Sequence, residues 1–240
     1  MRLTMIQLEP DMARLVRWAN TRRLLAPRGE DDLGYALHAL LAATFGDLAP
    51  KPFVLRQEPC RPLKLLGYAS FPGDVLRRHA AATAEPDAAE AIGLERTFAS
   101  KTMPEAWDAG QRFGFALRTR PMVRTDREGN RARTKEVDCF VLSPPNSNRG
   151  DVYADWLRGH LAGADLEHVA LDAFRLSRVR RRNAGRTLKD QKGPEASFSG
   201  ILRISDSAAF AATLSRGVGR HRAFGFGMLL LRPLRGAGPC

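Results

Sequence analysis

The sequence predicts an α+β protein with two tandem ferredoxin-like (RRM-like) domains, each a βαββαβ antiparallel sheet with helices on one face. Alternating apolar segments and segments with helical spacing follow in the order strand, helix, two strands, helix, strand, and this order then approximately repeats. The length of 240 residues also suffices for two domains of roughly 100–120 residues. We expect domains at 1–108 and 112–240, with the boundary near 109–111.

The first half begins with a short strand and a long apolar helix. We expect the strand at 3–8, and a helix that is capped by Asp31 or Asp32 and closed by Gly46. Leucines and a phenylalanine recur along this helix at helical spacing, which places them on one face. The remaining expected elements of this half are strands at 53–56 and 63–69 and a helix at 74–82.

The second half contains the same kinds of element around a polar turn. The segment 113–118 alternates as a half-buried strand does, and the polar residues 126–130 predict a hairpin. Ser205 or Asp206 can cap a helix that ends at Gly217. The other expected elements are a helix at 151–161 and strands at 174–179, 198–204 and 226–231.

The charge of the chain points to a polyanionic partner. Lys and Arg number 38 against 26 acidic residues, so the net charge is +12 and the isoelectric point is near 10.5. Nucleic acid is the leading partner and acidic membrane lipid the second. The basic residues gather at 118–135 and 175–192, whereas the apolar helix at 33–45 carries no Lys or Arg. We therefore expect a nucleic-acid partner and no membrane.

Several other classes of protein are not expected. The chain has no apolar run of about 20 residues and no apolar signal core near its start, so we expect a cytoplasmic protein. Cys60, Cys139 and Cys240 form neither a disulfide framework nor a CxxC clamp, and no cluster has metal-ligand spacing. We expect no metal and no cofactor.

The strongest local motif is the glycine-rich segment 217–227, with the sequence GVGRHRAFGFG. A dinucleotide fingerprint runs from strand through glycines to helix, but here a helix precedes the glycines and a strand follows them. Arg220, His221 and Arg222 stand within the segment, which favours contact of a glycine loop with phosphates. The alternative is a purely structural role, with Gly217 as a helix C-cap.

A second motif, Tyr35-Ala-Leu-His38, lies on the apolar helix. Residues three apart share a helix face, and His38 falls at the margin of the apolar stripe. An imidazole that is anchored by the core and reaches solvent can serve as a general acid or base near neutral pH. The alternative is that both are ordinary surface residues.

Together these motifs resemble the CasE-type CRISPR repeat-RNA endoribonuclease of the type I-E Cascade complex. The glycine-rich ending GVGRHRAFGFGMLLLRPL, the Tyr-x-Leu-His helix and the basic stretch FALRTRPMVRTDREGNRARTKE carry this resemblance over nearly the whole chain. The chain departs from the family in an extra stretch at about 11–30 and in Arg222, where family loops often have lysine.

The resemblance implies metal-independent cleavage of the CRISPR repeat hairpin in precursor crRNA. The ribose 2′-OH attacks the adjacent phosphate and leaves a 2′,3′-cyclic phosphate. It implies a catalytic role for His38 and Tyr35, with His221 as a less favoured second acid or base. If His38 is not the catalyst, Arg22, Arg23 or Arg222 are the alternatives that would stabilise the phosphorane. The other partners implied are further Cascade-type subunits, with the protein remaining on its product. The alternative function is a non-catalytic RNA-binding subunit.

The basic runs and the glycine-rich segment supply the residues expected to bind RNA. They are Arg118, Arg120, Arg124, Lys135, Arg178, Arg180, Arg181, Arg182, Arg186, Gly217, Gly219, Arg220, His221, Arg222, Gly225 and Gly227.

Overall fold

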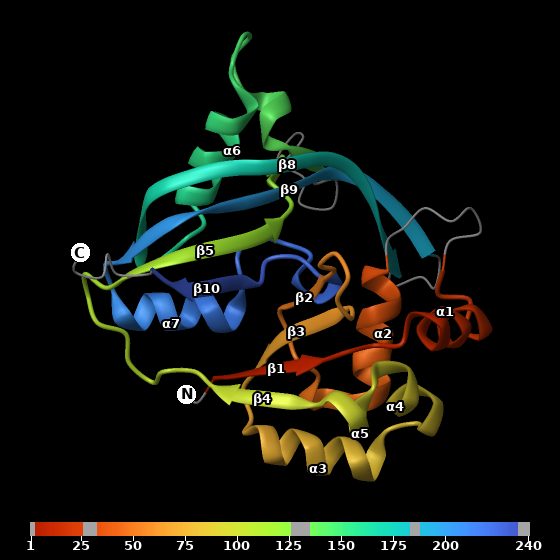
Figure 1. Cartoon of the computed structure of the whole chain (residues 1–240). Coiled ribbons are helices and arrows are strands. Elements are labelled where there is room, and N and C mark those ends of the chain that lie inside the picture. The colour runs from red at the N-terminus through yellow and green to blue at the C-terminus, as the bar shows by residue number, and fades with distance from the viewer. Residues whose placement is uncertain (1–2, 26–32, 126–134, 183–187, 235–240) are drawn as a thin grey trace.

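Two four-stranded antiparallel sheets form the centre of the molecule (Figure 1). The computed structural model describes residues 3–25, 33–125, 135–182 and 188–234. The first sheet has the order β2 (Phe53–Arg56), β3 (Lys64–Ala69), β1 (Thr4–Leu8) and β4 (Ala99–Thr102). The second has the order β10 (Leu229–Pro233), β5 (Arg112–Thr119), β9 (Leu188–Ile204) and β8 (Ala164–Arg182). The predicted α+β fold with two ferredoxin-like units is confirmed.

Five helices accompany the described part of the first sheet. They are α1 (Met12–Thr21), α2 (Gly34–Phe45), α3 (Gly73–Thr83), α4 (Pro86–Ile92) and α5 (Leu94–Thr97), with a 3₁₀ turn, η1 (Gly46–Leu48), after α2. The N-cap of α2 is Leu33, whose side chain makes no capping bond, and the two expected caps, Asp31 and Asp32, lie outside the described residues.

The sequence pattern missed α1 and β4 in this half. α1 falls in the extra stretch, where Asp11 caps the helix by accepting a hydrogen bond from the backbone N–H of Arg14, and Leu15 and Trp18 are buried. All four residues of β4 are exposed, so this edge strand carries no alternation of apolar and polar residues.

The second sheet carries α6 (Arg149–Arg158) and α7 (Ser207–Arg216). Asp206 caps α7 as predicted, and Gly217 ends it. The strands β6 (Met122–Thr125) and β7 (Lys135–Asp138) pair on both sides of the expected hairpin, whose tip at 126–134 lies outside the described residues. The 3₁₀ turns are η3 (Cys139–Leu142) and η4 (Arg222–Phe224).

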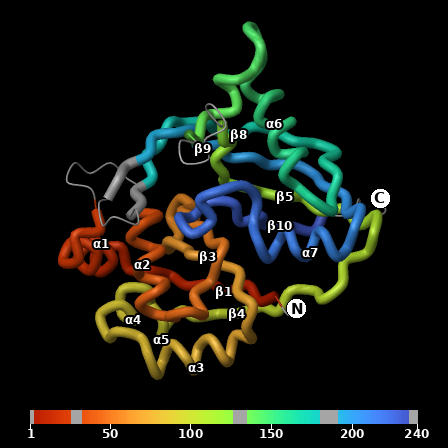
Figure 2. Tube along the Cα trace, turned by 180° about the vertical axis from the view of Figure 1, so that it is seen from behind, coloured from red at the N-terminus to blue at the C-terminus, as the bar shows by residue number. Residues whose placement is uncertain are grey.

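The hairpin of β8 and β9 is much longer than its short apolar segments indicated. The two strands contain 19 and 17 residues, and their register shifts at Leu166/His168 and at Leu171/Ala173. β5 pairs with β9 only between Ala196 and Arg203, so the far end of the hairpin leaves the sheet and reaches α2 (Figures 1 and 2). The second half thereby touches the helix that bears the Tyr-x-Leu-His motif.

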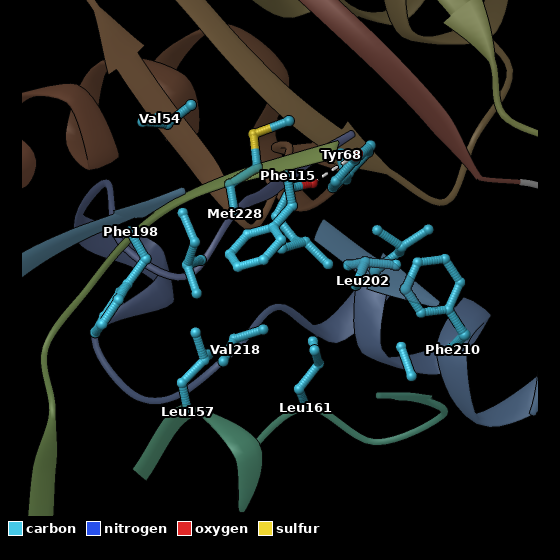
Figure 3. Close-up of a cluster of buried hydrophobic side chains, with 14 of the residues drawn as sticks. Val54, Tyr68, Phe115, Leu157, Leu161, Phe198, Leu202, Phe210, Val218 and Met228 are labelled. Atoms are coloured by element: carbon cyan, nitrogen blue, oxygen red, sulfur yellow. Dashed lines mark hydrogen bonds between the residues drawn. The ribbon is translucent and has the colours of Figure 1, made fainter. Parts of the chain in front are cut away.

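One buried cluster joins both sheets (Figure 3). Val54 and Tyr68 of the first half pack there with Phe115, Phe198 and Met228 of the second. The hydroxyl of Tyr68 donates to the backbone carbonyl of Leu229 at 3.0 Å, and burial raises the pKa of this phenol, so it stays a neutral donor. This bond fixes β10, and the glycine-rich segment before it, against β3. The division into 1–108 and 112–240 stays a prediction.

A second buried cluster lies between the first sheet and its helices. Ile6 and Leu8 of β1 pack there against Leu37, Leu40 and Leu41 of α2. This packing fixes the inner face of α2 and leaves its margin available. Among the described helices, none is long and apolar enough to cross a membrane.

Candidate active site

His38 lies at the margin of the apolar face of α2, as its spacing predicts, whereas Tyr35, which the spacing places on the far side of the helix, is partly buried as well. Ala36, Leu37 and Leu40 are buried, whereas Tyr35 and His38 are partly exposed. The apolar residues between and beyond them hold the helix on the sheet. The two motif side chains therefore have a rigid support and access to solvent.

The glycine-rich loop, residues 217–227, follows α7 and depends on its glycines. Gly217, Gly219, Gly225 and Gly227 all have positive φ, between 75° and 83°, where other residues are strained. The N–H of Val218 donates to the carbonyl of Gly227 at 2.8 Å, which closes the loop. A Cβ on Gly227 would lie 2.4 Å from the carbonyl oxygen of Val218. The expected C-cap role of Gly217 is confirmed; RNA contact by these glycines stays a prediction.

Phe224 brings the two sequence motifs together. Its ring centre lies 5.4 Å from that of His38 in an edge-on arrangement, and 6.3 Å from that of Tyr35 in a stacked one. His221 also packs against this ring, at 6.3 Å. In the sequence, Phe224 is only one residue of the glycine-rich motif, and nothing local marks it as the contact with α2. Two segments far apart in the chain thus form one candidate centre.

The environment of His38 favours its neutral form. Burial lowers the pKa of His38 below its usual value, and the positive charge of Lys51 lowers this pKa further. A neutral imidazole has a free nitrogen lone pair and can accept a proton near neutral pH. Lys51 is exposed and precedes β2, and no sequence motif marked it. Its charge is also of the sign that stabilises a phosphorane.

His221 is engaged in an ionic network. Its Nε2 lies 3.0 Å from Oε2 of Glu136, whose other oxygen pairs with Arg220 at 2.7 Å. Gln191 also donates to Glu136 at 3.0 Å. The hydrogen bond from His221, with the charge of Arg220, lowers the pKa of Glu136 to about 2. His221 therefore positions the loop, and a role as second acid or base stays a prediction.

Arg120 is buried, and the expectation that it binds RNA is wrong. Its side chain has 0% exposure. It donates to the backbone carbonyls of Pro194, Ser177 and Gln191 at 3.1–3.3 Å. The guanidinium therefore joins β5 to the hairpin of β8 and β9. A basic residue in an apolar strand pattern does not reveal such a structural use.

Arg118 and Arg22 also have acidic partners inside the protein. Arg118 pairs with the buried Glu195 at 2.8 Å and stacks on Phe226 at 4.6 Å. Arg22 pairs with Glu85, the N-cap of α4, and with Asp87 of α4, and it lies over Trp18 at 4.6 Å. The contacts of Arg22 hold the described part of the extra stretch against α4, and its charge is already paired with carboxylates of the protein. Arg23 is exposed.

The other expected RNA-binding cations lie on the two hairpins. Arg124 and Lys135 are exposed on β6 and β7, and Arg178 is exposed on β8. Arg180, Arg181 and Arg182 are opposite Asp190, Lys189 and Leu188 in the strand register. Arg186 lies outside the described residues. That these cations bind RNA stays a prediction.

No cluster of three His, Cys, Asp or Glu residues with metal-binding geometry occurs in the described parts of the chain. Cys60 and Cys139 are free thiols, and Cys240 lies outside the described residues. That the reaction needs no metal stays a prediction.

The fold is shared with solved endoribonuclease structures. A structure of the CRISPR endoribonuclease Cse3 bound to 19 nt RNA has 22% identity and a TM-score of 0.63, with 97% of this chain and 98% of that chain covered. Thermus thermophilus Cse3, bound to an RNA representing a pre-cleavage complex, has 21% identity and a TM-score of 0.60, with 97% and 100% covered. Escherichia coli Cas6e has 19% identity and a TM-score of 0.51, with 98% and 100% covered.

A comparison with curated protein sequences finds no significant match. The family model of CRISPR associated proteins, by contrast, matches residues 1–233. Because this match spans both sheets, α2 and the glycine-rich loop, the chain belongs to the CRISPR-associated protein family.

Proposed function

We propose that this protein is a metal-independent endoribonuclease that binds and cleaves the repeat hairpin of precursor crRNA. The observation that carries the proposal is the meeting of His38 and Tyr35 with Phe224 of the glycine-rich loop. Family membership and structural likeness to Cse3 and Cas6e support it.

The chemistry follows from the state of His38. The neutral ring accepts the proton of the ribose 2′-OH, and the 2′-oxygen forms a bond to the adjacent phosphorus. The bond between phosphorus and the 5′-oxygen then breaks, and the protonated ring can return its proton to the leaving oxygen. The products are a 2′,3′-cyclic phosphate and a 5′-OH. Tyr35 positions the phosphate, and nearby cations such as Lys51 offset the charge of the phosphorane.

The protein also acts within a larger assembly under this proposal. A structure named CRISPR RNA-guided surveillance complex contains a chain with 19% identity and a TM-score of 0.53, which covers 96% of this chain. We propose that the protein stays on its product as part of a Cascade-type complex. Its net charge of +12 suits retention of RNA.

The test is incubation of a labelled repeat hairpin with the protein in EDTA. We expect one discrete cut with a 2′,3′-cyclic phosphate end. A 2′-deoxy nucleotide immediately upstream of the cut should block the reaction because the nucleophile is then missing. Tight binding without cleavage would support the alternative function, a non-catalytic RNA-binding subunit, and would overturn the assignment of His38.

A further inference from the structure

A basic pocket lies beside the glycine-rich loop and contains none of the residues placed at the candidate centre around Phe224. Its volume is about 430 Å³. Its polar lining comes from β6, the end of α6, the end of α7 and the loop. The lining includes Arg124, His160, Arg216, Gly219, Arg220 and Arg222. Neither Arg216 nor His160 belongs to the residues expected to bind RNA.

The arginines of this pocket gather with little compensation by acidic groups. Arg220 pairs with Glu136 at 2.7 Å. Among the residues that the structure describes, no carboxylate pairs with Arg124, Arg216 or Arg222. Burial lowers the pKa of Arg222, and the charges of Arg216 and Arg220 lower it further. Clustered like charges repel, and a bound anion would relieve this repulsion.

Contacts that hold the walls of the pocket in place leave most N–H groups of the arginines without a protein partner in the described residues. Nη1 of Arg222 donates to the backbone carbonyl of Arg216 at 2.8 Å, which leaves the other N–H groups of its guanidinium for a ligand. The ring of His160 stacks on Trp156 at 4.2 Å, with Nδ1 at 2.8 Å from the carbonyl oxygen of Trp156. Rigid guanidinium forks suit the oxygen atoms of a phosphate.

Gly219 brings the loop backbone close to this wall. A Cβ at this position would lie 2.7 Å from the ring of Trp156, and its φ is +75°. Only glycine therefore permits the loop to approach α6 this closely, and this approach forms one side of the pocket.

The pocket also lies close to the candidate centre. Arg222 lines it, and Phe224, two residues later, contacts His38. Two residues span at most about 7.6 Å between Cα atoms. A strand of RNA held at His38 would thus place a neighbouring phosphate within reach of the pocket.

We propose that this pocket binds one backbone phosphate of the RNA strand, near the cleaved phosphate but distinct from it, and thereby sets which bond reaches His38. The inference rests on the proposed function, because it takes RNA as the ligand. Arg216, with Arg124 and Arg222, supplies the charge, and His160 forms the rim.

The test neutralises phosphates one at a time. A series of repeat hairpins each carries one uncharged methylphosphonate linkage, with 2′-deoxyribose on its 5′ side so that the linkage is stable. Binding of each hairpin is measured for the wild type, for Arg216→Gln and for Arg77→Gln. Arg77 is the matched control because it is an exposed arginine on α3, on the opposite side of the first sheet from β10 (Figures 1 and 2).

We expect one linkage near the cut to cost the wild type about tenfold in affinity, the order of one charge-assisted contact. Arg216→Gln should bind the unmodified hairpin about tenfold more weakly, and a methylphosphonate at that linkage should not lower its affinity further. It should also cut at more than one position. Arg77→Gln should keep the wild-type profile.

The inference is overturned if Arg216→Gln and Arg124→Gln bind every hairpin with the affinity of Arg77→Gln. It is also overturned if each methylphosphonate linkage lowers the affinity of Arg216→Gln by as much as it lowers that of the wild type. These outcomes differ from failure of the proposed function, in which the wild type does not cut RNA at all. If the wild type does not cut but Arg216→Gln still removes the affinity loss at one linkage, the pocket is established as a phosphate site. The nuclease assignment is then wrong.

Discussion

The two sheets have the same strand order, but their central hairpins differ greatly. β2 and β3 contain 4 and 6 residues, whereas β8 and β9 contain 19 and 17. The helices that precede these hairpins differ as well: α2 carries Tyr35 and His38, and α6 carries Trp156. Under the proposed function, this repeated scaffold serves two tasks: cleavage chemistry in the first half and contact with RNA in the second.

The glycine-rich loop lies between these two corresponding helices. Phe224 packs against His38 of α2, and Gly219 lies against Trp156 of α6. The loop itself belongs to the second half and precedes β10. The comparison teaches that the candidate site is a property of the contact between the halves, and variants of each half should fail in different ways.

The largest effect is expected in the first half. His38→Ala should slow cleavage by about 10²–10⁴-fold and leave hairpin binding nearly unchanged, because it removes proton transfer and no phosphate contact. Alanine is a good helix former, so the free energy of unfolding should change little. Single-turnover cleavage and a binding titration on one substrate measure the two effects. A near wild-type rate would move the proton transfer to His221 or Tyr35.

Changes in the second half should weaken RNA binding more than cleavage. Replacing Arg180, Arg181 and Arg182 together by Gln should weaken hairpin binding more than it slows the cleavage of RNA already bound. With about six phosphate contacts, wild-type affinity should fall by roughly 10³ between 50 and 200 mM salt, and the triple variant should have a shallower slope. A flat salt response of the wild type would show that these arginines only face solvent.

Arg120 and Arg124 separate structure from binding within the second half. Arg120→Met should lower the free energy of unfolding by about 3 kcal/mol, because one buried and two partly buried hydrogen bonds to backbone carbonyls lose their charged donor. Arg124→Met, the matched change at an exposed site, should keep stability within about 0.5 kcal/mol and weaken RNA binding. Urea denaturation of both variants measures the two free energies of unfolding. Equal stability of the two would contradict the structural role of Arg120.

The loop between the halves can be tested through its glycines. Gly227→Ala should cost about 2–3 kcal/mol of stability and reduce cleavage, since its Cβ meets the carbonyl of Val218. Gly110→Ala is the control: its φ is +86°, but no atom lies within 4 Å of the added Cβ, so only backbone strain of about 1 kcal/mol remains. Thermal denaturation compares the two, and equal losses would contradict a crowded loop closure.

The smallest effect concerns the pH dependence of cleavage. The lowered pKa of His38 means that the rate should rise with pH at acidic values and level off below the usual histidine value of about 6.5. Lys51→Met removes a positive charge, so the pKa of His38 should rise and the acidic limb should move to higher pH. Lys101→Met, a change at an exposed lysine of β4, should leave the limb in place. A rate that falls as pH rises would instead assign His38 as the acid.

The order of elements and both chemical motifs could be predicted from the sequence alone. Helical and strand periodicity, the cap at Asp206 and the glycine at 217 are local signals, since each depends on residues a few positions apart. The margin position of His38 on α2 follows from the same local spacing. Weak or absent local signals explain the misses: β4 has no alternation, and α2 begins after Leu33, which is not a residue type that caps helices.

Only the tertiary structure decided how these parts meet. Phe224 contacts His38, Lys51 shifts its pKa, Glu136 engages His221, and Arg120 turns inward to the carbonyls of the long hairpin. Each of these relations joins residues that are not neighbours in the chain, and the contact of Phe224 with His38 also depends on how the two halves share one core. Residue type and spacing do not predict such packing, because an arginine is the same in sequence whether its side chain binds a phosphate or three backbone carbonyls of its own protein.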